Sequence, residues 1–104
     1  HVVDVSRGVV GAGMRIELFR GSTSVAAGAA SNKGLLELDE RVEAGRYEAV
    51  FHVAEWYRAQ NVALPKVPFL DVVRYSFGIS DPKQHYHLPF KCTPWGYSCF
   101  RGGA

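Results

Sequence analysis

The sequence predicts an all-β protein, an antiparallel β-sandwich of about seven to eight strands with one short helix. Apolar and polar residues alternate with period two in several short segments, which is the pattern of half-buried strands. Glycine, proline and asparagine turn signals separate these segments at close spacing. One further segment breaks the alternation and lacks glycine and proline, which favours a helix. At 104 residues, the chain is expected to form a single domain, 1–104, around one hydrophobic core.

The first half of the chain is expected to supply most of the strands. Residues 1–5 are β-branched and alternating, and the glycine-rich segment 6–13 is predicted to be a loop. A cleanly alternating strand follows at 14–20. Small residues predict an edge strand at 25–30, and an Asn-Lys-Gly turn then leads to a short strand at 35–38.

The second half continues the pattern and contains the helix. The strongest alternation in the chain lies at 46–53, and it ends in the helix-forming segment 54–61. Pro65 and Pro68 bracket an irregular connector, after which period two returns at 72–79. We therefore expect the helix to be a single short element between two strands.

The segment 85–103 concentrates ionisable residues beside a Pro-Trp-Gly turn, and it is predicted to be a hairpin of two short strands. Successive side chains of a strand point to opposite faces, so His85, His87 and Lys91 are expected to share one face. Ser98 lies in the strand after the turn. An apolar core does not explain two imidazoles and an ammonium group, so this face is the candidate functional site.

The His85-Tyr86-His87 spacing also fits a metal site, because it can place two imidazoles on one ion or on one substrate. A zinc site would need a third ligand, for which His1, His52 and Asp4 are candidates only if the fold brings them together. Such a pair on a surface strand is more often solvated, and His52 is most simply an exposed strand residue. No metal and no other cofactor is predicted.

Composition and charge exclude several classes of protein. Twelve basic and ten acidic residues give a net charge of +2 without a basic run, so no nucleic-acid partner is expected. No apolar run approaches the roughly 20 residues of a membrane-spanning helix, so no membrane partner is expected. Cys92 and Cys99 flank the hairpin turn; free thiols in a reducing cytosol are favoured, with a disulfide left open. No signal peptide is recognised, and a first residue of His1 instead of methionine leaves processing or trimming open.

Two motifs at opposite ends of the chain carry a resemblance to a known family. The opening HVVDVSRG with GAGMRIEL, and the ending HYHLP with PWGYS and FRG, resemble 5-hydroxyisourate hydrolase, the transthyretin-related family. The similarity spans nearly the whole chain. In the middle, the Gly45-Arg46-Tyr47 strand start, the Trp56-Tyr57 helix and the Pro65–Pro68 connector follow the family's order.

The resemblance implies a transthyretin-like sandwich that assembles as a homotetramer, with active sites at the dimer–dimer interface. It also implies a hydrolase that opens a small cyclic amide, 5-hydroxyisourate, in urate catabolism, which is part of purine metabolism. The expected partner is therefore a small heterocyclic substrate, and the expected location is cytoplasmic.

The resemblance also implies catalytic roles for His1, His87 and Arg101. A neutral imidazole can remove a proton from water as the water attacks an amide carbonyl, because histidine titrates near working pH. The residues expected to bind the substrate are His85, Lys91, Ser98, Leu35, Phe100 and Gly102.

Several positions depart from the family pattern. Leu35 stands where the family has an arginine, Phe100 and Gly103 replace the tyrosine and serine of the terminal Y-R-G-S signature, and Lys91 replaces an apolar residue. Arginine binds a planar anion through two parallel hydrogen bonds, which leucine cannot form. Either Lys91 restores the missing charge and the reaction survives, or the pocket is remodelled for a different small heterocycle. A third alternative is a non-catalytic carrier of a small ligand. The presence of His1, His87 and Arg101 is evidence against this alternative.

Overall fold

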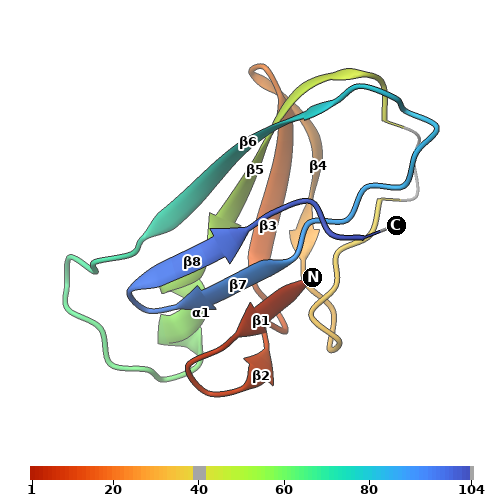
Figure 1. Cartoon of the computed structure of the whole chain (residues 1–104). Coiled ribbons are helices and arrows are strands. Elements are labelled where there is room, and N and C mark those ends of the chain that lie inside the picture. Colours follow the sequence, from red (N-terminus) through yellow and green to blue (C-terminus); the bar gives the residue numbers. More distant parts are fainter. Residues whose placement is uncertain (39–41, 104) are drawn as a thin grey trace.

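The structure, a computed structural model, describes residues 1–38 and 42–103. The elements in this part of the chain are β1 (Val2–Asp4), β2 (Val9–Val10), β3 (Arg15–Arg20), β4 (Thr23–Ala29), β5 (Gly45–His52), α1 (Val53–Ala59), β6 (Val72–Ile79), β7 (Phe90–Thr93) and β8 (Gly96–Cys99). The strands form two four-stranded sheets, ordered β2-β1-β7-β8 and β4-β3-β5-β6, which face each other across the core (Figure 1). The predicted β-sandwich with one short helix is confirmed. Within the described residues, no helix is long and apolar enough to span a membrane.

One strand pair departs from the antiparallel pattern. Most neighbouring strands run antiparallel, as predicted, but β1 and β7 run parallel, with Val2 beside Phe90 and Asp4 beside Cys92. These strands lie near opposite ends of the chain, so no short hairpin connection imposes an antiparallel direction on them. The pairing places the first residues of the chain beside the segment that carries the candidate histidines (Figure 1).

The core lies between the two sheets, and its aromatic residues join them. The rings of Phe51 in β5 and Phe90 in β7 stack with their centroids 3.9 Å apart. The buried Trp56 of α1 donates from Nε1 to the carbonyl oxygen of Ala12 at 2.7 Å, which fixes the helix against the loop before β3. The buried cluster comprises Val2, Met14, Ile16, Ala30, Ala49, Phe51, Val53, Trp56, Tyr57, Val73, Phe90 and Cys92.

A buried carboxylate anchors the N-terminal strand. Asp4 is 0% exposed, and its oxygens accept hydrogen bonds from the Ser6 N–H at 3.0 Å and the Ser6 hydroxyl at 2.6 Å. They also accept from Arg7 Nε at 2.7 Å and from the Tyr57 hydroxyl at 2.8 Å. Burial alone would raise the pKa of the Asp4 carboxyl, but these hydrogen bonds outweigh it and hold the pKa below its usual value. Burial also raises the pKa of the Tyr57 phenol, so this hydroxyl stays a donor and ties β1 to α1.

Three local predictions are corrected by the structure. The strand predicted at 35–38 is wrong, because the chain turns back on itself there and the Ser31 N–H donates to the Leu35 carbonyl oxygen at 2.8 Å. The segment 6–13 is not a loop throughout, since it contains the two residues of β2. The closing hairpin is shorter than predicted, because its first strand begins only at Phe90.

Candidate active site

Main-chain hydrogen bonds bring the two histidine candidates to one end of the β1–β7 pair. The main-chain nitrogen of His1 lies 3.2 Å from the Leu88 carbonyl oxygen, to which it donates. The His1 carbonyl oxygen accepts from the Phe90 N–H at 2.7 Å. His1 is therefore held beside the segment that directly follows His87, although the two residues are far apart in sequence.

A tight turn places the Leu35 position next to the same strand end. The Gly34 carbonyl oxygen accepts from the Val2 N–H at 2.7 Å, and Gly34 has a φ of 76°. A Cβ at Gly34 would lie 2.6 Å from the Val2 carbonyl oxygen, so no other residue fits this approach. The half-buried Leu35 thus stands one residue from the contact with β1, close to His1. The Asn-Lys-Gly turn signal locates this glycine in the sequence, but the pattern does not reveal its contact with Val2.

The C-terminal tail packs against His87 through a glycine. The Gly102 N–H donates to the His87 carbonyl oxygen at 2.7 Å. A Cβ built at Gly102 would lie 2.6 Å from Nδ1 of His87 and 3.0 Å from Cγ of Pro89, so the imidazole sits directly against the glycine backbone. Gly102 was predicted to bind the substrate; its observed contact is with the His87 ring.

We expect Gly102→Ala to lower kcat of the hydrolysis that the family resemblance implies by about 10- to 100-fold. The new methyl group must displace the ring of His87, the expected catalytic histidine, and small misplacements of a catalytic group cost this much. Gly103→Ala is the matched control, since a Cβ there meets nothing within 4 Å. Thermal unfolding should be nearly the same for both variants, and kcat separates them. Equal kcat for the two variants would contradict the positioning role of Gly102.

Arg101 contacts the segment that carries the histidines. Its guanidinium carbon lies 4.2 Å from the centroid of the Tyr86 ring, and Nη2 donates to Oε1 of Gln84 at 3.0 Å. A longer contact of 3.4 Å joins Nη2 to the His85 carbonyl oxygen. The side chain of His85 is exposed. Arg101 therefore holds the main chain just before His87, and its catalytic role stays a prediction.

The Lys91 and Ser98 positions face each other across the hairpin. They are directly paired in the β7–β8 register, and both side chains are exposed. Lys91 Nζ lies 5.8 Å from the centroid of the Phe100 ring. His85 and His87 precede the strand, so the shared strand face predicted for them and Lys91 is wrong; strand geometry applies only from Phe90 onward.

The two cysteines are free thiols, and neither is suited to nucleophilic chemistry. Cys92 is buried and Cys99 is half-buried. Burial raises the pKa of each thiol to about 11, so the thiolate form is scarce near neutral pH.

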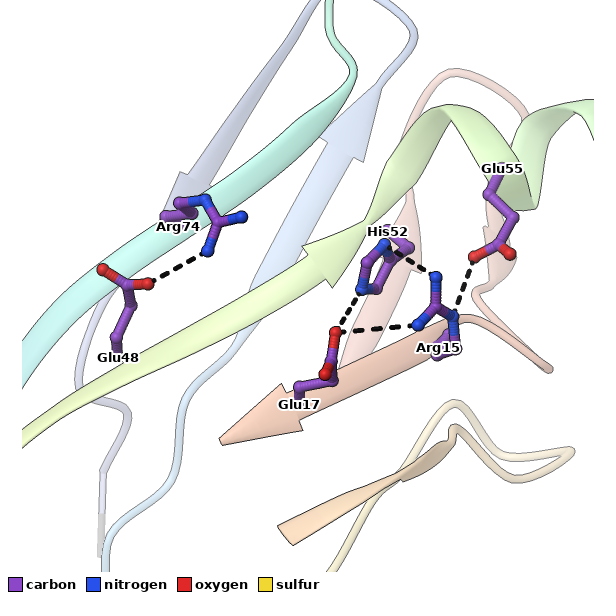
Figure 2. Close-up of polar contacts among 6 residues, drawn as sticks. All are labelled: Arg15, Glu17, Glu48, His52, Glu55 and Arg74. Carbon is purple, nitrogen blue, oxygen red and sulfur yellow. Dashed lines mark hydrogen bonds and ion pairs between the residues drawn. The ribbon is translucent and has the colours of Figure 1, made fainter. Parts of the chain in front are cut away.

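A separate polar cluster lies on the other sheet, and Figure 2 shows it. His52 Nε2 is 2.7 Å from Oε1 of Glu17, and its Nδ1 is 3.3 Å from Nη2 of Arg15, whose Nε donates to Glu55 at 3.2 Å. A neutral imidazole protonated at Nε2 satisfies both contacts. His52 and the enclosed Asp4 thus have their own partners away from the histidine pair. In residues 1–38 and 42–103, no group of three or more His, Cys, Asp or Glu side chains could hold a metal ion.

A surface pocket of about 620 Å³ lies beside this cluster rather than at the histidines. Arg15, Glu17, Glu55 and Trp56 line it together with small residues of β4. The three charged groups already pair with one another or with His52, so their charges are not available to orient a substrate. We therefore place the candidate active site at the end of the β1–β7 pair, where the main chain holds His1 beside the segment that follows His87.

Comparisons with known proteins agree with the observed fold. Residues 1–102 match the HIUase/Transthyretin family. A 5-hydroxyisourate hydrolase of Deinococcus radiodurans is 40% identical over an alignment of 110 positions. The alignment covers 98% of this chain and 92% of that protein.

Two solved structures superpose on nearly the whole chain. The structure of Klebsiella pneumoniae 5-hydroxyisourate hydrolase matches with a TM-score of 0.87 and 25% identity, covering 99% of this chain and 94% of that chain. (S)-allantoin synthase matches with a TM-score of 0.89 and 32% identity, and this chain spans only 42% of its length. The family match covers nearly all of the chain, so the chain belongs to the HIUase/Transthyretin family.

Proposed function

We propose that this chain is a hydrolase that opens a small cyclic amide, 5-hydroxyisourate, in urate catabolism. The observation that carries the proposal is the nearly full-length similarity, at 40% identity, to a curated 5-hydroxyisourate hydrolase. The main-chain contacts that hold His1 beside the segment after His87 support it, because the reaction needs imidazole groups at one site. The proposed catalytic residues are His1, His87 and Arg101.

The chemistry follows from water and a neutral imidazole. An imidazole of His1 or His87 accepts a proton from water while the water oxygen bonds to the amide carbonyl carbon. The carbonyl electron pair moves onto its oxygen, and the second imidazole or a nearby cation stabilises the resulting oxyanion. When the oxyanion collapses, the C–N bond breaks and the imidazolium returns its proton to the leaving nitrogen. One water is consumed, and the product carries a new carboxyl group and a new N–H.

The proposed assembly is a homotetramer with active sites at the dimer–dimer interface. Strands β6 and β8 are each one of the two edges of their sheet, so each presents unpaired backbone groups that a second copy can bind. In the connector between α1 and β6, Val67 is 84% exposed and Phe69 is 83% exposed. Exposed apolar side chains of this size are typical of surfaces that another subunit covers.

We expect Phe69→Ser to shift the protein toward smaller species, because the substitution removes an apolar side chain from the proposed subunit contact. Light scattering coupled to size-exclusion chromatography measures the mass. Lys66→Met is the control, since it changes an exposed residue of the same connector. An unchanged mass for Phe69→Ser at micromolar concentration would place Phe69 outside the interface.

The proposed location is the cytoplasm, and the proposed partner is a small heterocyclic substrate. Two free cysteines support a reducing compartment, because oxidising compartments favour disulfides. The net charge of +2 without a basic run supports a small-molecule partner over a nucleic acid.

The deciding experiment generates 5-hydroxyisourate from urate with urate oxidase and follows its absorbance with and without this protein. We expect the decay to accelerate well beyond the spontaneous rate. A protein that hydrolyses related lactams or imides, but not 5-hydroxyisourate, would have a remodelled pocket. Stoichiometric binding without product would instead identify a carrier.

A further inference from the structure

Lys91 lies on the outer face of the β2-β1-β7-β8 sheet. Within β7, Phe90 and Cys92 are buried while Lys91 between them is exposed, so its side chain points away from the core. Its neighbours in the two flanking strands are Val3 of β1 and Ser98 of β8. The ammonium group therefore stands beside a hydroxyl on the same face.

His1 lies at the end of the same strand pair. It directly precedes β1, and its carbonyl oxygen accepts from the Phe90 N–H, so its main chain continues the pairing of β1 with β7. Val3 is paired with Lys91, which puts the main chains of Lys91 and His1 roughly 8 Å apart, from the spacing of neighbouring strands and of alternate residues. A small ring bound between them can touch the imidazole with one edge and the four-carbon lysine side chain with the other.

The surroundings leave the charge of Lys91 available to a ligand. Among the described residues, no carboxylate lies within ion-pair distance of Lys91. Its Nζ instead lies 5.8 Å from the centroid of the partly exposed Phe100 ring, an arrangement that orients the ammonium group without neutralising it. The other cation near the histidines, Arg101, is already engaged with Gln84. Leu35, which follows the Gly34 contact with Val2, adds no charge.

From these positions we infer that Lys91, with Ser98, binds the anionic edge of the substrate ring and makes the site select negatively charged planar heterocycles over neutral ones. The inference rests on the proposed hydrolase function and identifies the residues that determine its substrate specificity. The lysine supplies the charge and one or more donors, the serine hydroxyl adds a donor or acceptor, and Phe100 offers a flat apolar surface beside them. Lys91 binds the ring and does not take part in proton transfer.

The test compares the unaltered protein with Lys91→Met, Lys91→Arg and the matched control Lys66→Met, which removes an exposed lysine from the connector after α1. Steady-state kinetics with enzymatically generated 5-hydroxyisourate give kcat and KM. Calorimetric titration with urate, a planar purine anion, measures binding without turnover.

We expect Lys91→Met to raise KM and the Kd for urate by about 10- to 100-fold, the effect of losing one charge-assisted hydrogen bond. The kcat should change little, because a contact made equally in the bound substrate and the transition state affects KM alone. Lys91→Arg keeps the charge and should restore both constants toward those of the unaltered protein.

Equal KM and equal urate affinity in Lys91→Met and Lys66→Met would overturn the inference and leave the hydrolase intact. If the unaltered protein does not accelerate 5-hydroxyisourate hydrolysis, the proposed function fails separately. The urate titration then decides the role of Lys91. A loss of binding confined to Lys91→Met supports that role, and equal binding by all variants, or none by the unaltered protein, overturns it.

Discussion

Replacing His87 with alanine is expected to lower kcat for 5-hydroxyisourate hydrolysis by about 100- to 10,000-fold, the usual contribution of a general base. The reason is that His87, whose ring packs against Gly102, is the proposed general base, and the segment after it holds His1, the second proposed imidazole. His1→Ala should have an effect of the same order. Stopped-flow absorbance with freshly generated substrate measures both.

The control for this prediction is a histidine on the other sheet. His52→Gln removes an imidazole that contacts Glu17 and Arg15, far from the proposed site, and should leave kcat nearly unchanged (Figure 2). Circular dichroism establishes that each variant is folded, and His87→Gln provides a more conservative change if the alanine variant unfolds. Unchanged turnover in both His1→Ala and His87→Ala would refute the catalytic assignment.

Replacing Asp4 with alanine is expected to lower the free energy of unfolding by about 3 kcal/mol or more, because hydrogen bonds to a buried charged group are among the strongest individual contributions. Asp4 accepts from Ser6, Arg7 and Tyr57, and its removal leaves the buried Tyr57 hydroxyl with only the thiol of Cys92 nearby, at 3.6 Å. Tyr57→Phe removes a single one of these bonds and should cost about 1.5 to 3 kcal/mol, the usual range for a hydrogen bond to a charged group. Urea denaturation at one protein concentration compares the variants. A midpoint for Asp4→Ala equal to that of the unaltered protein would contradict the anchoring role of Asp4.

The same carboxylate predicts how stability depends on pH. The folded-state pKa of Asp4 lies below its unfolded value, so its contribution is fully present above about pH 4 and is lost as the pH falls through the lower, folded pKa. The unaltered protein should therefore lose stability in this acidic range. Asp4→Asn, which cannot titrate, should show a shallower loss when urea midpoints are measured from pH 6 down to pH 3.

The strands were predictable where one face of the strand is buried and the other is not. The segments 14–20, 46–53 and 72–79 alternate because each contributes to the inner face of one sheet. They correspond to β3, β5 and β6, except that Met14 precedes β3 and Val53 already belongs to α1. The strand predicted at 35–38 does not form. The pattern shows which residues are apolar, but it does not show that the Ser31 N–H will donate to the Leu35 carbonyl oxygen. The parallel pairing of β1 with β7 could not be predicted either. A hydrophobic pattern shows which face of a strand is buried, but not which strand lies beside it.

For the candidate site, the sequence supplies residue types but not their geometry. The H-x-H motif makes His85 and His87 candidates, and the family resemblance implies the catalytic role of His87, which stays a prediction. The close approach of Gly102 to that ring depends on atoms brought together by the fold, so no local pattern encodes it. Asp4 left a readable signal, since it alternates with Val2 on the buried face of β1, yet its hydrogen-bond partner in α1 is more than 50 residues away.

The parallel pairing of β1 with β7 has a consequence for biosynthesis. The hydrogen bond between His1 and Leu88 joins residues 87 positions apart, so β1 can pair early with the nearby β2 but gains β7 only after residue 90 has been made. The β4-β3-β5-β6 sheet comes from one continuous stretch and can assemble earlier, because its contacts are closer in sequence. A product that stops before residue 90 can thus build the β4-β3-β5-β6 sheet, but it lacks the strand that holds His1 in place.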